Sequence, residues 1–262
     1  GPSADLTYKT KTIGESLDTL QQVVQGEHRY SAVFRRAERP IGASALLSQL
    51  REVNPRAQVC VLHKDASTVA ALDVGFVPGV NSAPLSKAKT VVLLGCDDEK
   101  TLAQLPADAT VVYIGSHGDA GAARADVVLP AAAYTEKAGT YVNTAGRVQR
   151  TAPATTSPGE VRADWSILRA LSEFCDCDTL PYDSAEQVHE RLAEVSPAFA
   201  QYDSVQTVSV KTPVQEDTVD LQKPLQPSMS NYWLSNAIAR ASKVMAQSSQ
   251  ELPTAANSYT PQ

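Results

Sequence analysis

The strongest candidate for chemistry in this sequence is a glycine-bracketed turn that contains a histidine and an aspartate. It reads Gly115-Ser-His-Gly118-Asp-Ala-Gly121 and follows an apolar run, at the kind of strand end where α/β folds place ligands. His117 and Asp119 would form an acid–base pair there. The alternative is a structural turn, in which the glycines supply positive φ angles and Asp119 caps a backbone N–H. We favour the turn, because no nucleophile or set of metal ligands accompanies the pair.

A basic loop with Arg35, Arg36 and Arg39 offers a second possible site, one that could hold a phosphate. A dinucleotide site would place glycines after the first strand, so that backbone N–H groups can approach the pyrophosphate. The segment that follows Phe34 has no such glycine cradle. We therefore favour a solvated or ion-paired loop.

The cysteines and histidines show no metal-ligand spacing. Cys175-Asp-Cys177 is C-x-C rather than C-x-x-C, and Cys60 and Cys96 lie in strand contexts, where a thiol behaves as a small hydrophobic group. The four histidines are scattered along the chain: His28, His63, His117 and His189. We predict that this chain has no catalytic, cofactor-binding or metal-ligating residue.

The composition restricts the class of protein. Of the 262 residues, 43% are hydrophobic, which is enough for a packed core. The formal net charge of −6 argues against a nucleic-acid partner. No apolar run approaches the roughly 20 residues of a membrane-spanning helix, so we expect no direct membrane span. These features indicate a soluble, acidic, intracellular protein.

The elements that would position these residues alternate along the first 150 residues. Short apolar runs predict strands at 31–34, 58–62, 90–94, 110–114 and 126–129. Amphipathic spacing predicts helices at 12–24, 45–53, 67–72 and 97–105. Continuous apolar strands separated by helices indicate a parallel sheet covered on both faces. The predicted fold class is therefore α/β, a doubly wound, Rossmann-like parallel sheet with a C-terminal helical extension.

The remainder of the chain has a different character. Helices are predicted at 164–174, at 183–195 with Asp183 as N-cap, and at 232–245. Three prolines and no clear period mark an arm between the last two of these helices. The predicted parts are an N-terminal helix (1–30), an α/β part (31–150), a helical extension (151–205), a Pro-containing arm (206–228), a docking helix (229–246) and a polar tail (247–262).

One stretch carries a specific sequence signature. Ala125-Asp-Val-Val-Leu-Pro130 precedes a loop that resembles the E-x-x-G-T-x-x-N-x-x-G-R-x-Q pattern of the molybdopterin oxidoreductase superfamily. We expect Glu136 to pair with Arg147, Asn143 to cap a turn, and Gly139 and Gly146 to permit tight bends. The residues assigned this structural role are Asp126, Pro130, Glu136, Gly139, Thr140, Asn143, Gly146, Arg147 and Gln149.

Further segments narrow the resemblance. Ala70-Ala-Leu-Asp-Val-Gly-Phe-Val-Pro-Gly79, Leu180-Pro-Tyr-Asp183 and Ile238-Ala-Arg-Ala-Ser242 are similar to the C-terminal part of the large iron–sulfur subunit family of respiratory NADH:ubiquinone oxidoreductase, complex I. The resemblance covers about residues 30–246. It implies a molybdopterin oxidoreductase-like domain without molybdenum. It also implies a location on the matrix side of the inner mitochondrial membrane.

The resemblance therefore implies a structural, non-catalytic subunit or half-subunit of the peripheral arm of complex I, which is no enzyme on its own. Iron–sulfur clusters are expected on a companion chain or on a missing N-terminal part, and none on this chain. The expected partners are that iron–sulfur part and other peripheral-arm subunits. Two alternatives are a C-terminal fragment of an active molybdopterin oxidoreductase and an independent nucleotide-binding α/β domain.

Overall fold

The computed structural model describes residues 31–35, 52, 58–63, 66, 68–76, 84–175, 178–205 and 231–251. The predicted helix at 12–24, nearly all of the helix at 45–53, the arm at 206–228 and the tail beyond 251 lie outside these residues. So do Arg36, Arg39 and Cys177. The chain divides into two compact units, residues 1–68 with 207–230 and residues 69–206 with 231–262, and each is described by itself.

The first unit contains a pair of parallel strands. Strand β1 (Ser31–Arg35) pairs with β2 (Gln58–Leu62), with Ser31 opposite Gln58 and Arg35 opposite Leu62. Both strands lie where the apolar runs predict them.

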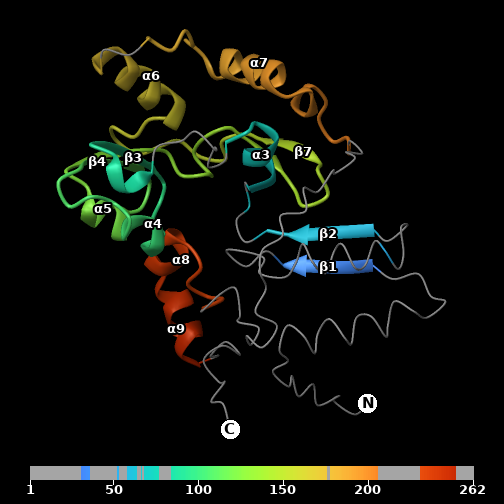
Figure 1. Ribbon diagram of the computed structural model, residues 1–262, viewed down its shortest axis with the longest axis horizontal. Coiled ribbons are helices and arrows are strands. Elements are labelled where there is room, and N and C mark those ends of the chain that lie inside the picture. Colours follow the sequence, from blue (N-terminus) through green and yellow to red (C-terminus); the bar gives the residue numbers. More distant parts are fainter. Residues whose placement is uncertain are drawn as a thin grey trace. The chain divides into compact units, whose positions relative to one another are not determined.

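A three-stranded parallel sheet forms the centre of the second unit (Figure 1). Its strands are β3 (Thr90–Leu94), β4 (Thr110–Gly115) and β5 (Val127–Pro130), in the order β3-β4-β5. The short helices α4 (Glu99–Leu102) and α5 (Ala120–Arg124) connect them, and α4 is shorter than the predicted 97–105. The α/β class is confirmed.

The helices and the 3-10 turn η1 (Leu85–Lys87) cover one face of this sheet. Val91, Leu93, Val111 and Tyr113 are buried there. The packing partners are Leu85, Ala88, Cys96, Leu102, Leu105, Ala122 and Ala125. On the other face of β3, Val92 and Leu94 are 46% and 50% exposed. The expected covering of both faces is thus seen on one face among the described residues.

A β-hairpin and three helical segments build a second core. Strands β6 (Gly139–Val142) and β7 (Val148–Thr151) pair antiparallel, and β7 continues across residue 150. Buried Val142, Val148 and Phe199 pack against side chains from α3 (Thr68–Asp73), α7 (Ala185–Val195) and η2 (Pro197–Ala200). Helix α6 (Asp164–Phe174) has the predicted bounds.

Helix α7 begins two residues later than predicted. The Ser184 hydroxyl, not Asp183, caps it by accepting a hydrogen bond from the Gln187 backbone N–H at 3.2 Å. Asp183 instead lies 3.1 Å from the guanidinium of Arg169. Because serine and aspartate are both good caps, the sequence alone could not choose between these neighbours.

The predicted single helix at 232–245 is wrong, because two helices are present. Helix α8 (Ala237–Ala241) is capped by Asn236, and α9 (Lys243–Glu251) starts after Ser242, whose backbone is extended at ψ 121°. The Ser242 hydroxyl accepts a hydrogen bond from the Met245 N–H at 3.3 Å. Asparagine and serine side chains compete for backbone N–H groups and so interrupt helices. Helix α9 also extends into the first residues of the predicted polar tail.

Candidate functional site

The candidate site lies at the carboxyl ends of β3 and β4. Because the two strands are parallel, the residues that follow them meet at one edge of the sheet, the usual ligand position in α/β folds. This carboxyl edge and the α8–α9 segment enclose an open pocket of about 580 Å³. Its lining is Gly95, Asp97, Tyr113, Ser116, His117, Tyr134, Asn236, Ala237, Ile238, Ala239, Ser242 and Met245.

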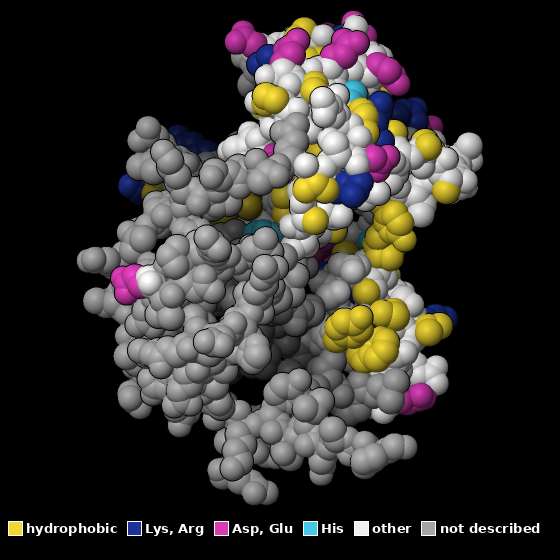
Figure 2. Space-filling model, turned by 90° about the vertical axis from the view of Figure 1, so that its right-hand side faces the viewer, with side chains coloured by type: hydrophobic (Ala, Val, Ile, Leu, Met, Phe, Trp, Pro, Cys, Tyr) yellow, Lys and Arg dark blue, Asp and Glu magenta, His cyan; other side chains and the backbone are white. Residues whose placement is uncertain are grey.

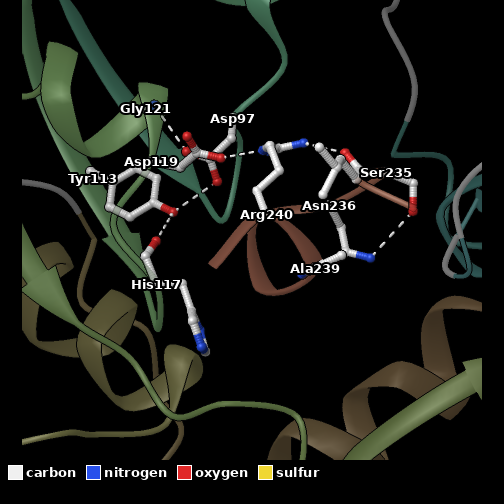
Figure 3. Close-up of polar contacts among 10 residues, drawn as sticks. Asp97, Tyr113, His117, Asp119, Gly121, Ser235, Asn236, Ala239 and Arg240 are labelled. Atoms are coloured by element: carbon white, nitrogen blue, oxygen red, sulfur yellow. Dashed lines mark hydrogen bonds and ion pairs between the residues drawn. The ribbon is translucent and has the colours of Figure 1, made fainter. Parts of the chain in front are cut away.

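A buried tyrosine links the two strand ends (Figure 3). The Tyr113 hydroxyl lies 3.0 Å from Asp97 Oδ2 and 3.0 Å from the backbone oxygen of His117. The other oxygen of Asp97 accepts a hydrogen bond of 2.9 Å from the Gly121 N–H. Burial, followed by the Asp97 hydrogen bond and charge, raises the pKa of Tyr113 above its usual range. The phenol therefore stays protonated and serves as a donor.

The glycines of the turn are required for space rather than for positive φ angles. Gly115, Gly118 and Gly121 are not among the described glycines with positive φ, which corrects the predicted role. A Cβ on Gly121 would overlap the Cys96 carbonyl oxygen and lie 2.8 Å from the Tyr113 ring. A Cβ on Gly115 would lie 2.6 Å from the same ring. The turn thus packs directly against Tyr113.

His117 and Asp119 do not form the acid–base pair. His117 Nδ1 lies 3.0 Å from the Ser116 hydroxyl, and the His117 ring points away from the carboxylates in Figure 3. Asp119 occupies the N-cap position of α5 without a side-chain cap hydrogen bond, so its predicted capping role is wrong too. Its Oδ2 instead accepts from Arg240 Nε at 2.5 Å. Sequence reasoning did not find Arg240, which is separated from Asp119 by 121 positions.

The signature residues are distributed over β5, the hairpin and its turn. Asp126 Oδ2 accepts a hydrogen bond from the Val111 N–H at 2.8 Å, and Pro130 pairs with Gly115 at the end of β5. Thr140 and Gln149 lie in the hairpin ladder, opposite Arg150 and Tyr141. These four residues therefore support strand pairing.

The hairpin turn meets its expectations in part. Asn143 Oδ1 accepts from the backbone N–H groups of Ala145 and Arg147, and Gly146 has φ +80°, so the predicted cap and bend are present. Gly139 is different, because it opens β6 in an extended conformation.

The expected Glu136–Arg147 pair does not form among the described residues. Glu136 Oε2 accepts from the Ala133 N–H at 3.0 Å, and Arg147 donates to the backbone oxygen of Asp203. Each side chain thus binds the backbone instead of the other.

Within the described part of the chain, no cluster of three or more His, Cys, Asp or Glu side chains could hold a metal ion. No helix of that part is long and apolar enough to cross a membrane.

Three named relatives match this chain over much of its length. The potato protein "NADH dehydrogenase [ubiquinone] iron-sulfur protein 1, mitochondrial" is 37% identical over 95% of this chain. The Neurospora crassa "NADH-ubiquinone oxidoreductase 78 kDa subunit, mitochondrial" is 47% identical over 72% of it. The Reclinomonas americana "NADH-ubiquinone oxidoreductase 75 kDa subunit" is 33% identical over 95%. The matches span 36%, 26% and 39% of the lengths of these relatives.

Two family models also match. The model of a C-terminal region found in NADH-ubiquinone oxidoreductase matches residues 194–248, which include α8. "Molybdopterin oxidoreductase" matches residues 42–174, half of the chain, from before β2 to the end of α6. This stretch contains the parallel sheet, the carboxyl edge and the signature hairpin, so the chain belongs to the molybdopterin oxidoreductase family.

Proposed function

We propose that this chain is a non-catalytic, structural part of the large iron–sulfur subunit of complex I, or a half-subunit that completes it. The carrying observation is that 95% of the chain aligns with a relative named as an iron–sulfur protein of NADH dehydrogenase. It would support electron transfer from NADH to ubiquinone by clusters held on the N-terminal iron–sulfur part. No cofactor is assigned to this chain.

The chemistry of the carboxyl edge supports a structural role. The polar groups at the strand ends bond to one another and to α8, as the Tyr113–Asp97–Gly121 and Asp119–Arg240 contacts illustrate. A catalytic site would instead keep a nucleophile, a base or metal ligands directed at a substrate.

The proposed location is the matrix side of the inner mitochondrial membrane, in the peripheral arm of complex I. The potato and Neurospora relatives carry "mitochondrial" in their names. The surface of α7 is acidic, with Glu186, Glu190 and Glu194 exposed. Figure 2 shows acidic side chains at the top, the end where Figure 1 places α7. Such a surface suits protein partners better than nucleic acid.

The test is to tag the chain in its native host and to separate detergent-solubilised mitochondrial membranes by native electrophoresis. We expect the tagged chain to migrate with the band that oxidises NADH, together with a cysteine-rich iron–sulfur polypeptide. Migration of the chain alone, away from that activity, would refute the proposal.

The family assignment keeps one alternative in view, a C-terminal fragment of an active molybdopterin oxidoreductase. Metal analysis of the purified assembly separates the two functions. Iron without molybdenum or tungsten is expected here, whereas stoichiometric molybdenum or tungsten would favour the alternative.

A further inference from the structure

The carboxyl edge of β3 and β4 is already supplied with negative charge by the chain itself. Asp97 and Asp98 follow β3, and Asp119 follows β4. Anion sites at strand ends depend on free backbone N–H groups, but the Gly121 N–H is bonded to the Asp97 carboxylate. These carboxylates repel a phosphate and attract a cation.

The cation is Arg240 of α8. Its Nε donates to Asp119 Oδ2 at 2.5 Å, and its guanidinium also donates to the Leu234 carbonyl oxygen at 3.2 Å. The Arg240 and Asp119 side chains are only 36% and 28% exposed, so solvent screens this ion pair less than a fully exposed one. Figure 3 shows the Arg240 side chain extending from α8 toward the carboxylates.

The segment that carries Arg240 is tied together by its own hydrogen bonds. Asn231 Nδ2 donates to the Ser249 hydroxyl at 2.7 Å and so joins the start of the segment to α9. Asn236 Oδ1 caps α8 through the Ala239 N–H at 2.9 Å. Residues 231–251 can therefore approach the edge as one preformed unit.

Helix α8 also stands where a ligand would stand. The pocket is lined by the strand ends on one side and by Asn236–Ala239, Ser242 and Met245 on the other. We infer that residues 231–251 are an intramolecular strap that occupies the ligand position of the sheet, that the Arg240–Asp119 ion pair latches it, and that the edge is thereby closed to nucleotides. This inference does not depend on the assembly proposed above.

Hydrogen exchange of the 262-residue chain, read by mass spectrometry, tests the latch. We expect Arg240→Gln to raise the exchange rates of α8 and α9 amides about fivefold, the effect of losing about 1 kcal/mol. The amides of β4 should exchange as in the wild type, which reports that the variant is folded. The charge swap Asp119→Arg with Arg240→Asp should restore slow exchange.

The matched control is Arg191→Gln, which removes an ion pair to Glu194 whose side chains are 55% and 65% exposed. It should leave α8 and α9 unchanged. Unchanged exchange of α8 in folded Arg240→Gln would overturn the latch. Protection of the 116–121 amides of the wild type by millimolar ATP or NADH would overturn the closure of the edge.

Discussion

At the scale of single residues, Gly121 carries the tightest constraint in the carboxyl edge. Its backbone N–H binds Asp97 while its Cα faces the Cys96 carbonyl and the Tyr113 ring. Any larger residue must displace backbone or a fully packed ring, and neither can move cheaply in a close-packed interior. The glycine therefore sets how closely α5 approaches the sheet.

Gly121→Ala should destabilise the chain by about 3 kcal/mol, the upper range for overpacking. The measurement is the urea midpoint of unfolding. Gly146→Ala is the control, because Gly146 has φ +80° but nothing near its missing Cβ. Its cost should be about 1 kcal/mol, from backbone strain alone. Equal costs for the two variants would contradict the steric role of Gly121.

Tyr113→Phe should cost about 1–2 kcal/mol, because it removes the hydroxyl that joins Asp97 to the His117 carbonyl in a buried position. Tyr134→Phe is the matched control, since Tyr134 is 59% exposed. That change should be close to neutral. Thermal unfolding followed by circular dichroism checks both, and a neutral Tyr113→Phe would mean that the hydroxyl network contributes nothing.

The sequence predicts residue roles well where the partner is close along the chain. The Asn143 cap follows from a local turn preference, and it is present. Glu136, Arg147 and Asp119 were assigned local partners, yet Arg147 binds residue 203 and Asp119 binds residue 240. Tertiary contacts of this kind leave no periodic signal in the sequence.

At the scale of elements, strands and long helices were predictable because their patterns are dense. Strand β3 and helix α6 have the predicted bounds, each supported by apolar residues at the spacing of its type. The C-terminal helix was misjudged because the apolar spacing of Leu234, Ile238, Ala241 and Met245 continues across Ser242. The hydrogen bond of the serine hydroxyl overrides that spacing.

The packing of α7 on the hairpin should depend on pH through His189. Its Nδ1 lies 3.1 Å from the Tyr202 hydroxyl, the two rings stack at 5.2 Å, and Arg150 lies over the Tyr202 ring. Burial, followed by the charge of Arg150, lowers the pKa of His189 below its ordinary 6.5, although Glu190 and Glu186 act in the opposite direction.

The sign of the effect follows from proton uptake. The folded state holds the His189 proton more weakly than the unfolded state, so the stabilisation is complete above about pH 6.5 and is lost as the pH falls through the lowered pKa. His189→Gln should flatten that part of the pH profile. Urea unfolding between pH 5 and 8 is the measurement, and an unchanged slope in the variant would assign the dependence to other groups.

At the scale of the whole molecule, the uncovered sheet face is the feature that demands a larger assembly. Parallel strands are normally buried on both faces, yet Val92, Leu94 and Val128 are 46%, 50% and 53% exposed. The family could be recognised from the sequence, because its signature spans the sheet and hairpin. What covers this face could not, because the covering side chains are distant in sequence or belong to another chain.

Leu94→Lys should therefore reduce incorporation of the chain into the NADH-oxidising band on native gels severalfold. A charge on this face cannot be buried against an apolar partner without a cost of several kcal/mol. The side chain is half exposed in the isolated chain, so its own unfolding midpoint should change little. Thr156→Lys, on an exposed loop, is the control and should assemble normally. Full incorporation of Leu94→Lys would show that this face stays open to solvent in the assembly, and the partner surface would have to lie elsewhere on the chain.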